Sequence, residues 1–126
     1  MTRTKGQIEA QICEAVTKFE KDYMGRGPLE IKAYILDNIV LVRLKNVLTQ
    51  AEMNLAQASG HREGRELIKR VRIALLEQGR HILESVIEEI LATKIVSFHT
   101  DISTVTGEKV ILFSLATPVL YVQSPQ

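Results

Sequence analysis

The segment from Ser97 to Glu108 holds the highest density of side chains able to do chemistry. If residues alternate across a strand there, His99 and Asp101 point to the same side, about 6 to 7 Å apart along the chain. That pairing suits a histidine oriented by a carboxylate, or part of a metal or phosphate site. Nucleophilic catalysis needs a hydroxyl or thiol aimed at the histidine, and the spacing places none there. The alternative interpretation is the solvated polar face of a half-exposed sheet.

A second candidate site is the loop Met24–Pro28, in which Arg26 lies between two glycines. A guanidinium and free backbone N–H groups in such a loop can bind an anion. The loop lacks the spacing of a Walker loop or a dinucleotide fingerprint. Because glycine and proline also follow helix ends, the alternative is a structural linker.

Together these segments form one candidate site, which would make the chain an anion- or nucleotide-binding protein or an enzyme. The candidate ligand-binding residues are Arg26, Gly27, His99, Asp101, Thr104 and Thr106. The pattern assigns no catalytic residue and no metal ligand, and it leaves any cofactor unknown. His81 has no companion at ligand spacing. Cys13 lies beside an apolar helical stripe, so we expect a small core residue rather than a nucleophile.

The composition indicates one globular domain, since the chain has 126 residues, 45% of them hydrophobic and 25% charged. A formal net charge of +1 gives no reason to expect nucleic acid as a partner. The single cysteine fits a reducing compartment, and the N-terminus has no secretory signal. The apolar runs are far shorter than the roughly 20 residues of a membrane span. We therefore expect a cytoplasmic protein without a membrane span.

Hydrophobic periodicity predicts three helices and four strands. The predicted helices cover residues 5–23, 50–58 and 62–92, and the predicted strands cover residues 29–36, 39–44, 95–102 and 110–115. Asp37 and Asn38 form the turn of the first hairpin, and Thr49 and Glu52 form a capping box. The short second helix is expected to stop at Ser59–Gly60.

The expected fold is an α+β two-layer sandwich. Two hairpins form an antiparallel sheet of about four strands in αββ-ααββ order, with the helices on one face. Residues 1–115 form the domain, and residues 116–126 form a C-terminal tail.

The long predicted helix carries two apolar stripes. The stripe assigned to the core comprises Leu67, Ile68, Val71, Leu75, Ile82, Val86 and Ile90, and the second comprises Leu76, Leu83 and Ile87. The helix would be roughly 45 Å long, whereas the domain should be only about 35 to 40 Å across. Either Gly79 breaks the helix, or its end packs on another subunit.

Charges on this helix are segregated, with basic residues in the first half and acidic residues in the second. That order opposes the helix dipole, but antiparallel packing about a two-fold axis would set the basic half against the acidic half. We predict a homodimer or higher homo-oligomer built on the second stripe. The candidate interface residues are Leu76, Leu83, Ile87, Arg65, Arg72, Glu84 and Glu88. The alternative is an exposed helix with solvated charges.

Three stretches of the chain resemble one known family. They are residues 5–10 continuing through Phe19–Pro28, then Gly64–Ile68, and then His99–Thr104 with Thr106–Glu108. These stretches are similar to the MpsC-like family of bacterial proteins, a domain of unknown function named for a sodium-translocating, membrane-potential-generating system. The resemblance covers about residues 5–115.

The resemblance implies a soluble accessory protein, linked to sodium or bicarbonate translocation, with a membrane transport-system subunit as a possible partner. It brings no catalytic residues onto this chain. The leading hypothesis is therefore a non-enzymatic interaction or regulatory protein, and the ligand site described above is the alternative.

Overall fold

The computed structural model describes residues 2–58 and 61–123, except for the side chain of His61. The elements follow in the order α1 (Lys5–Tyr23), β1 (Glu30–Leu36), β2 (Ile39–Lys45), α2 (Gln50–Gln57), α3 (His61–Leu91), β3 (Ile95–Ile102) and β4 (Lys109–Leu115). The α+β fold is confirmed, and each predicted element is present with its bounds within one residue. The predicted helix stop at Ser59–Gly60 lies outside the described residues.

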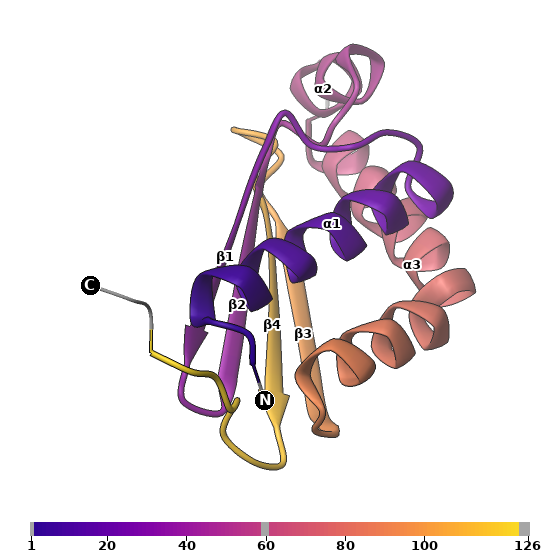
Figure 1. Ribbon diagram of the computed structural model, residues 1–126. Coiled ribbons are helices and arrows are strands. Elements are labelled where there is room, and N and C mark those ends of the chain that lie inside the picture. Colours follow the sequence, from indigo (N-terminus) through magenta and orange to yellow (C-terminus); the bar gives the residue numbers. More distant parts are fainter. Residues whose placement is uncertain (1, 59–60, 124–126) are drawn as a thin grey trace.

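The four strands form one antiparallel sheet in the order β1-β2-β4-β3. Asp37, in the turn of the first hairpin, has a φ of 60°, which aspartate tolerates better than most residues. Gly107 has a φ of 76° in the turn of the second hairpin, a backbone conformation that glycine adopts without strain. Helices α1 and α3 lie side by side over one face of the sheet (Figure 1).

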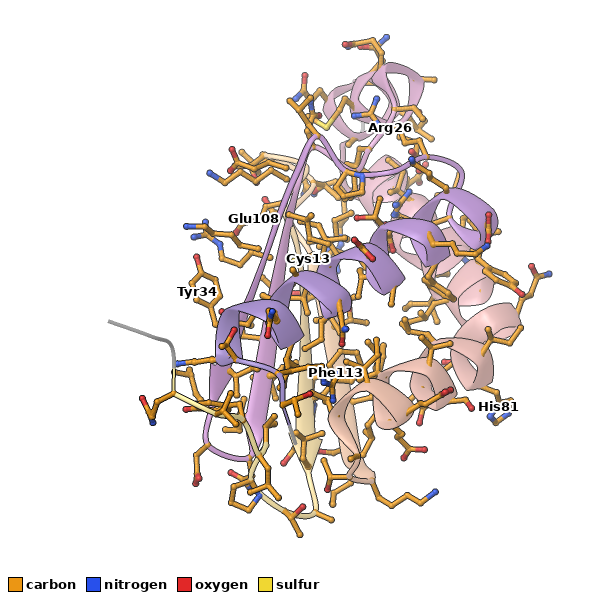
Figure 2. The ribbon with its side chains drawn as sticks, in the orientation of Figure 1. Cys13, Arg26, Tyr34, His81, Glu108 and Phe113 are labelled. Carbon is orange, nitrogen blue, oxygen red and sulfur yellow. The ribbon has the colours of Figure 1, made fainter. Side chains whose placement is uncertain are left out.

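The core lies between this sheet face and the helices. Val40 of β2 is paired with Phe113 of β4, and both are fully buried. Figure 2 shows Phe113 between the sheet and the helices, and Tyr34 and Glu108 on the side of the sheet that the helices leave uncovered. The prediction that the helices cover one face is confirmed.

Helix α3 is continuous through Gly79, which rules out a break there, the first of the two alternatives for this helix. A Cβ atom on Gly79 would lie 2.7 Å from Tyr23 Cδ1 and 2.8 Å from Phe19 Cε1. Gly79 therefore allows α1 to pack closely against α3. Near the start of α3, a Cβ on Gly64 would lie 2.3 Å from the carbonyl oxygen of Leu55 in α2. Helix α2 therefore covers the start of α3 within the single chain.

Two strands depart locally from the predicted pattern. The first begins one residue later than predicted, because Leu29 is exposed and precedes β1. In β3, Val96 lies at an irregularity where Ile95 and Ser97 pair with consecutive residues of β4. The local break in alternation turns Val96 toward solvent.

The chain beyond β4 packs on the domain as far as Val122. Val119 is buried, and its N–H donates to the carbonyl oxygen of Asp37 at 3.2 Å. The N–H of Val122 donates to the carbonyl oxygen of Arg3 at 2.9 Å. The first part of the predicted tail is thus in contact with both the first hairpin and the N-terminal segment. Across residues 2–58 and 61–123, no helix is both long and apolar enough to cross a membrane.

Candidate functional site

The most unusual feature of the interior is a buried ion pair between Glu20 of α1 and Lys109 of β4. Glu20 follows Val16 and Ile12 by four and eight residues, so it lies on the buried face of the helix. Lys109 alternates with Ile111 and Phe113, so it points inward from the sheet. Lys109 Nζ donates to Glu20 Oε2 at 2.8 Å, and the side chains of Lys109 and Glu20 are 5% and 0% exposed.

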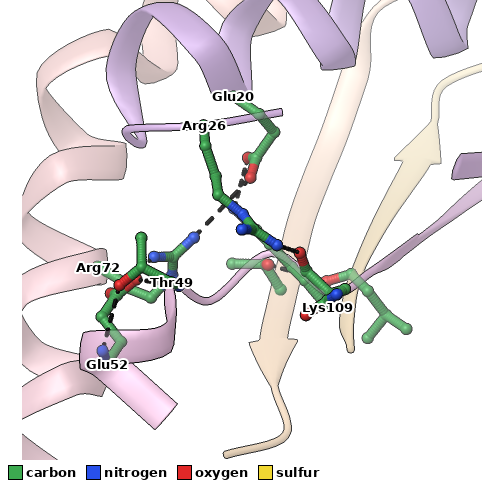
Figure 3. Close-up of polar contacts among 9 residues, drawn as sticks. Glu20, Arg26, Thr49, Glu52, Arg72 and Lys109 are labelled. Atoms are coloured by element: carbon green, nitrogen blue, oxygen red, sulfur yellow. Dashed lines mark hydrogen bonds and ion pairs between the residues drawn. The ribbon is translucent and has the colours of Figure 1, made fainter. Parts of the chain in front are cut away.

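Arg72 of α3 extends this pair into a network of charges (Figure 3). Its Nη1 donates to Glu52 Oε2 at 2.9 Å, while its Nη2 lies 4.0 Å from Glu20 Oε1. Glu52 also accepts the N–H of Thr49 and so closes the predicted capping box of α2. We call Glu20, Glu52, Arg72 and Lys109 the ionic cluster. It joins α1, α2, α3 and β4.

The ionic cluster pairs two cations with two carboxylates and is incompletely hydrogen-bonded. Arg26 reaches into the same region (Figure 3), where it donates to the carbonyl oxygen of Asn46. Three cations thus face two carboxylates. Four buried atoms of the region make no hydrogen bond within the described chain: Glu20 Oε1, Arg26 Nε, Arg72 Nε and Arg72 Nη2. Burial lowers the pKa of Lys109, an effect that Glu20 partly offsets and that the charge of Arg72 reinforces.

The predicted ligand residues of β3 take part in separate, local contacts. His99 Nε2 lies 3.2 Å from Ser97 Oγ. Asp101 accepts the N–H of Ile102 at 2.8 Å and the ammonium of Lys69 at 3.2 Å. Both contacts lower the pKa of the Asp101 carboxyl, and the hydrogen bond from the Ile102 N–H has the larger effect. Asp101 is thus bonded to Lys69 and Ile102, and among the described residues no hydrogen bond joins it to His99.

The other predicted ligand residues also have local roles. Thr104 is buried in the β3–β4 turn, and Thr106 Oγ1 accepts the N–H of Glu108 at 3.1 Å. A Cβ atom on Gly27 would lie 3.0 Å from Lys21 Cε, so the glycine lets the lysine stem pack over the loop. Within the described chain, no hydrogen bond or ion pair joins Arg26 to His99 or Asp101. Nor do three acidic, histidine or cysteine side chains of the described residues gather where they could hold a metal ion.

The apolar residues predicted for the oligomer interface are buried inside the single chain, which corrects that assignment. Leu76, Leu83 and Ile87 are 4%, 2% and 0% exposed, so they are core residues. Arg72 belongs to the ionic cluster. The sequence placed the two stripes the wrong way round because both are apolar and adjacent on the helix.

The charged residues of the predicted interface divide into two groups. Arg65 is exposed. Glu84 accepts Arg80 Nε at 2.8 Å, and Glu88 accepts the N–H of Ile95 at 2.8 Å. The two glutamates therefore already have partners within the chain.

Of the α3 stripe predicted for the core, Ile68 is buried as expected, but the other residues are largely exposed. Leu67, Val71, Ile82 and Val86 are between 39% (Val86) and 52% (Ile82) exposed. The half-buried Leu75 and Ile90 continue the same stripe. We call these six residues the outer row. On an otherwise charged helix, such a row is typical of a surface that another chain covers.

Taken together, the structure defines a two-layer α+β domain with a buried ionic cluster and an apolar outer row on its longest helix. The chain belongs to the MpsC family, because the family model described as "Na+-translocating membrane potential-generating system (MpsC)" matches residues 4–117. This confirms the resemblance seen in the sequence.

A relative in Bacillus subtilis (strain 168), described as "Uncharacterized protein YbcI", is 43% identical over 115 residues. The alignment covers 91% of this chain and 90% of the relative. No solved structure matches the chain significantly.

The sequence reasoning missed Glu20 and Lys109, although both left a signal. Glu20 keeps the helical spacing of Ile12 and Val16, and Lys109 keeps the two-residue spacing of Ile111. A charged residue at a position that the periodicity assigns to the core is worth noting, because charges are rarely buried without a partner.

Proposed function

We propose that this protein is an accessory component of a membrane ion-translocation system and that it acts as a homodimer through the outer row of α3. The observation that carries the proposal is the symmetry of this row. Counting from Leu67, its residues are spaced by four, four, seven, four and four positions. The spacing is therefore the same when the helix is followed in either direction.

An antiparallel pair of α3 helices would place apolar residues opposite apolar residues along the whole row. With the two-fold axis between Gln78 and Gly79, Leu67 lies opposite Ile90 of the second copy. In the same way Val71 lies opposite Val86, and Leu75 opposite Ile82. A two-fold interface needs such a self-complementary surface.

The charges of α3 support the same arrangement. Residues 62–72 contain five basic and two acidic residues, whereas residues 77–89 contain four acidic residues and one arginine. In an antiparallel pair, each basic half lies beside an acidic half of the second copy. The attraction is expected to weaken with salt, since most of these side chains are exposed.

Disulfide trapping tests the dimer and its register. In a Cys13→Ser background, Gln78→Cys lies near the proposed axis and should form a disulfide with its own copy. Leu67→Cys is a matched control, because the two copies of residue 67 would be about 35 Å apart. Leu67→Cys should cross-link only when it is mixed with Ile90→Cys. Efficient self-cross-linking of Leu67→Cys would rule out the antiparallel register.

Sedimentation of variants tests whether the outer row holds the dimer together. Val71→Lys should be monomeric at low salt, and adding Val86→Glu should restore the dimer because the two new charges face each other across the axis. Leu36→Lys is the control, since Leu36 is also exposed but lies at the end of β1. A wild-type chain that sediments as a monomer at low salt would refute the proposed dimer.

The proposed link to ion translocation rests on the family description, which names sodium, and bicarbonate is the alternative ion. The proposed partner is a subunit of such a transport system. Cross-linked capture of the tagged protein from native membranes should recover an integral membrane subunit of an ion-transport system, together with untagged copies of the protein. Recovery of the untagged copies without any transport subunit would refute the accessory role while leaving the dimer intact.

We also propose a cytoplasmic location, where the free thiol of Cys13 would stay reduced. A membrane-impermeant maleimide added to intact cells should therefore leave Cys13 unmodified. The same reagent should label Cys13 once the cells have been lysed and the protein has been denatured.

A further inference from the structure

We propose that the free edge of β3 binds an extended, uncharged segment of a partner protein as an added strand of the sheet. β3 is the last strand in the order β1-β2-β4-β3, so it is paired on one side only. An unpaired strand edge presents backbone N–H and carbonyl groups, which an extended chain can bind by strand addition. The proposal is independent of the dimer, because no outer-row residue lies in the cavity beside this edge.

The hydrogen bonds of the second hairpin show which backbone groups of β3 are free. The N–H of Ser103 donates to the carbonyl oxygen of Glu108 at 2.8 Å, across the hairpin. Along an antiparallel pair, residues that bond to the neighbouring strand alternate with residues that do not. Counting back from Ser103, the N–H and carbonyl groups of Phe98 and Thr100 therefore point away from β4. Among the described residues, no other group donates to or accepts from these backbone groups.

The opposite edge of the sheet is covered, which distinguishes it from the edge of β3. In β1, the N–H of Ile35 donates to Glu9 Oε2 of α1 at 3.0 Å, so α1 blocks strand addition there. In β3, the Asp101 carboxylate accepts the N–H of Ile102 at 2.8 Å. The irregularity near the start of β3 ends the regular register on the other side. The free stretch between these two points fits an added strand of about five residues.

A cavity beside this edge indicates which side chain the added strand carries. It has a volume of about 80 Å³ and lies between α3 and β3, and its walls include Ile73, Leu76, Thr100 and Ile102. Side chains that lie opposite each other on paired strands share one face of the sheet. A residue paired with Thr100 would therefore point toward this cavity. Because Ile73 is 57% exposed, an aliphatic side chain placed there would bury apolar surface on both molecules.

The charged side chains near the edge are already paired within the chain. Lys69 contacts Asp101 at 3.2 Å. Arg80 contacts Glu77 at 3.3 Å and Glu84 at 2.8 Å. A charge on the added strand would therefore have to compete with an existing ion pair. The expected segment is uncharged, with aliphatic residues facing the helices and polar residues on the other face of the sheet.

Amide hydrogen exchange of a fusion protein tests the proposal. The segment Ser-Val-Thr-Ile-Thr-Val-Ser is attached after Gln126 through a glycine–serine linker of about 30 residues, whose mean span is roughly 30 Å. The tether holds the segment at an effective concentration on the order of millimolar. In the chain without the fusion, the N–H groups of Phe98 and Thr100 should exchange faster than those of His99 and Asp101, which bond to β4. In the fusion, exchange at Phe98 and Thr100 should slow at least about threefold.

Two variants of the fusion locate the added strand. Thr100→Pro removes a free N–H without breaking the ladder to β4, and proline is tolerated where the N–H of an edge strand faces solvent. It should restore fast exchange at Phe98. Ile73→Lys should do the same, because it places a charge beside the cavity. Its matched control is Ile82→Lys, at a similarly exposed isoleucine of α3 outside the cavity, which should keep the slow exchange.

Three results would overturn the proposal. The first is unchanged exchange at Phe98 and Thr100 in the fusion. The second is slow exchange that persists in both Thr100→Pro and Ile73→Lys, which would place the segment elsewhere. The third is slow exchange of both N–H groups in the chain without the fusion. If that protection disappears on dilution, a second copy occupies the edge, and if it does not, the edge is closed within one chain.

Discussion

Replacing Lys109 by methionine removes the charge that neutralises Glu20 while keeping a side chain of similar length. Among the described residues, Glu20 then retains one ion pair, the 4.0 Å contact to Arg72 Nη2. Because Glu20 is fully buried, it cannot recover the lost interaction from water. Removing one partner of a buried pair typically costs about 3 to 5 kcal/mol. We expect Lys109→Met to lower the free energy of unfolding by at most this amount, because burial already makes the Lys109 charge costly in the folded chain.

The double variant Glu20→Met/Lys109→Met is the matched control. It removes both charges and replaces them with apolar groups of similar volume, which is often nearly neutral for a buried pair. We therefore expect the double variant to lose less than half of what Lys109→Met loses. Urea unfolding followed by circular dichroism measures both. With a slope of about 1.5 kcal/mol per molar urea, the single variant should shift the midpoint by at most about 2 to 3 M. Glu20→Met completes the comparison. If the losses of Lys109→Met and Glu20→Met simply add in the double variant, the two charges do not stabilise each other and the reasoning is wrong.

The depressed pKa of Lys109 gives the same pair a pH signature. The pKa of this ammonium is lower in the folded chain than its ordinary value of 10.5. Between these two values the unfolded chain binds more protons, so stability rises with pH. The contribution of Lys109 to the free energy of unfolding is complete above pH 10.5 and is lost as the pH falls through the pKa of Lys109 in the folded chain. The wild type should thus gain stability relative to the double variant between neutral pH and pH 10.5. A difference in stability between the wild type and the double variant that stays constant over this pH range would contradict a lowered pKa of Lys109.

Three further perturbations test other parts of the structure. Leu83→Ala should lower the free energy of unfolding in urea by about 2 to 5 kcal/mol. Leu67→Ala, in the outer row, should change the stability of a Val71→Lys monomer by less than about 1 kcal/mol. Equal losses of stability in the two alanine variants would contradict the orientation of α3. Gly64→Ala should separate α2 from α3, because the new Cβ would lie 2.3 Å from the carbonyl oxygen of Leu55, and faster amide exchange in α2 would reveal this; unchanged exchange would mean that the helices do not meet there. Burial raises the pKa of the Cys13 thiol above its usual value of 9.0, so the rate of alkylation should still be rising at pH 9.0, and a plateau below that pH would refute the shift.

The sequence predicted the elements of the fold well because each carries a strong periodic signal. The capping box at Thr49 and Glu52 fixes the start of α2, and the alternation in β4 fixes its inner face. What the sequence could not decide is how α3 is rotated about its own axis. Leu76 and Leu83 lie close to Leu75 and Ile82 on the helix surface, and all four are apolar. The rotation depends on the contacts that α1 and α2 make at the two glycines, and these are tertiary.

The candidate site was less predictable than the fold for a related reason. His99 and Asp101 attracted attention because such residues often do chemistry, yet their neighbours in the structure are Ser97 and Lys69. Arg72 looked like one of several surface bases on α3. Its role follows from Glu52 and Glu20, which come from two other elements and are distant in sequence. Pairing of this kind is set by how the layers pack, and no local pattern encodes it.

The contact between Arg3 and Val122 means that the described chain nearly forms a ring. A short glycine–serine bridge between these two points would span little distance. Joining them would lower the conformational entropy of the unfolded chain by closing a loop of more than 100 residues. In the chain-entropy treatment this raises the free energy of unfolding by up to about 4 to 5 kcal/mol. A cyclised version would therefore be a sturdier scaffold on which destabilising replacements in the ionic cluster could still be studied as folded protein.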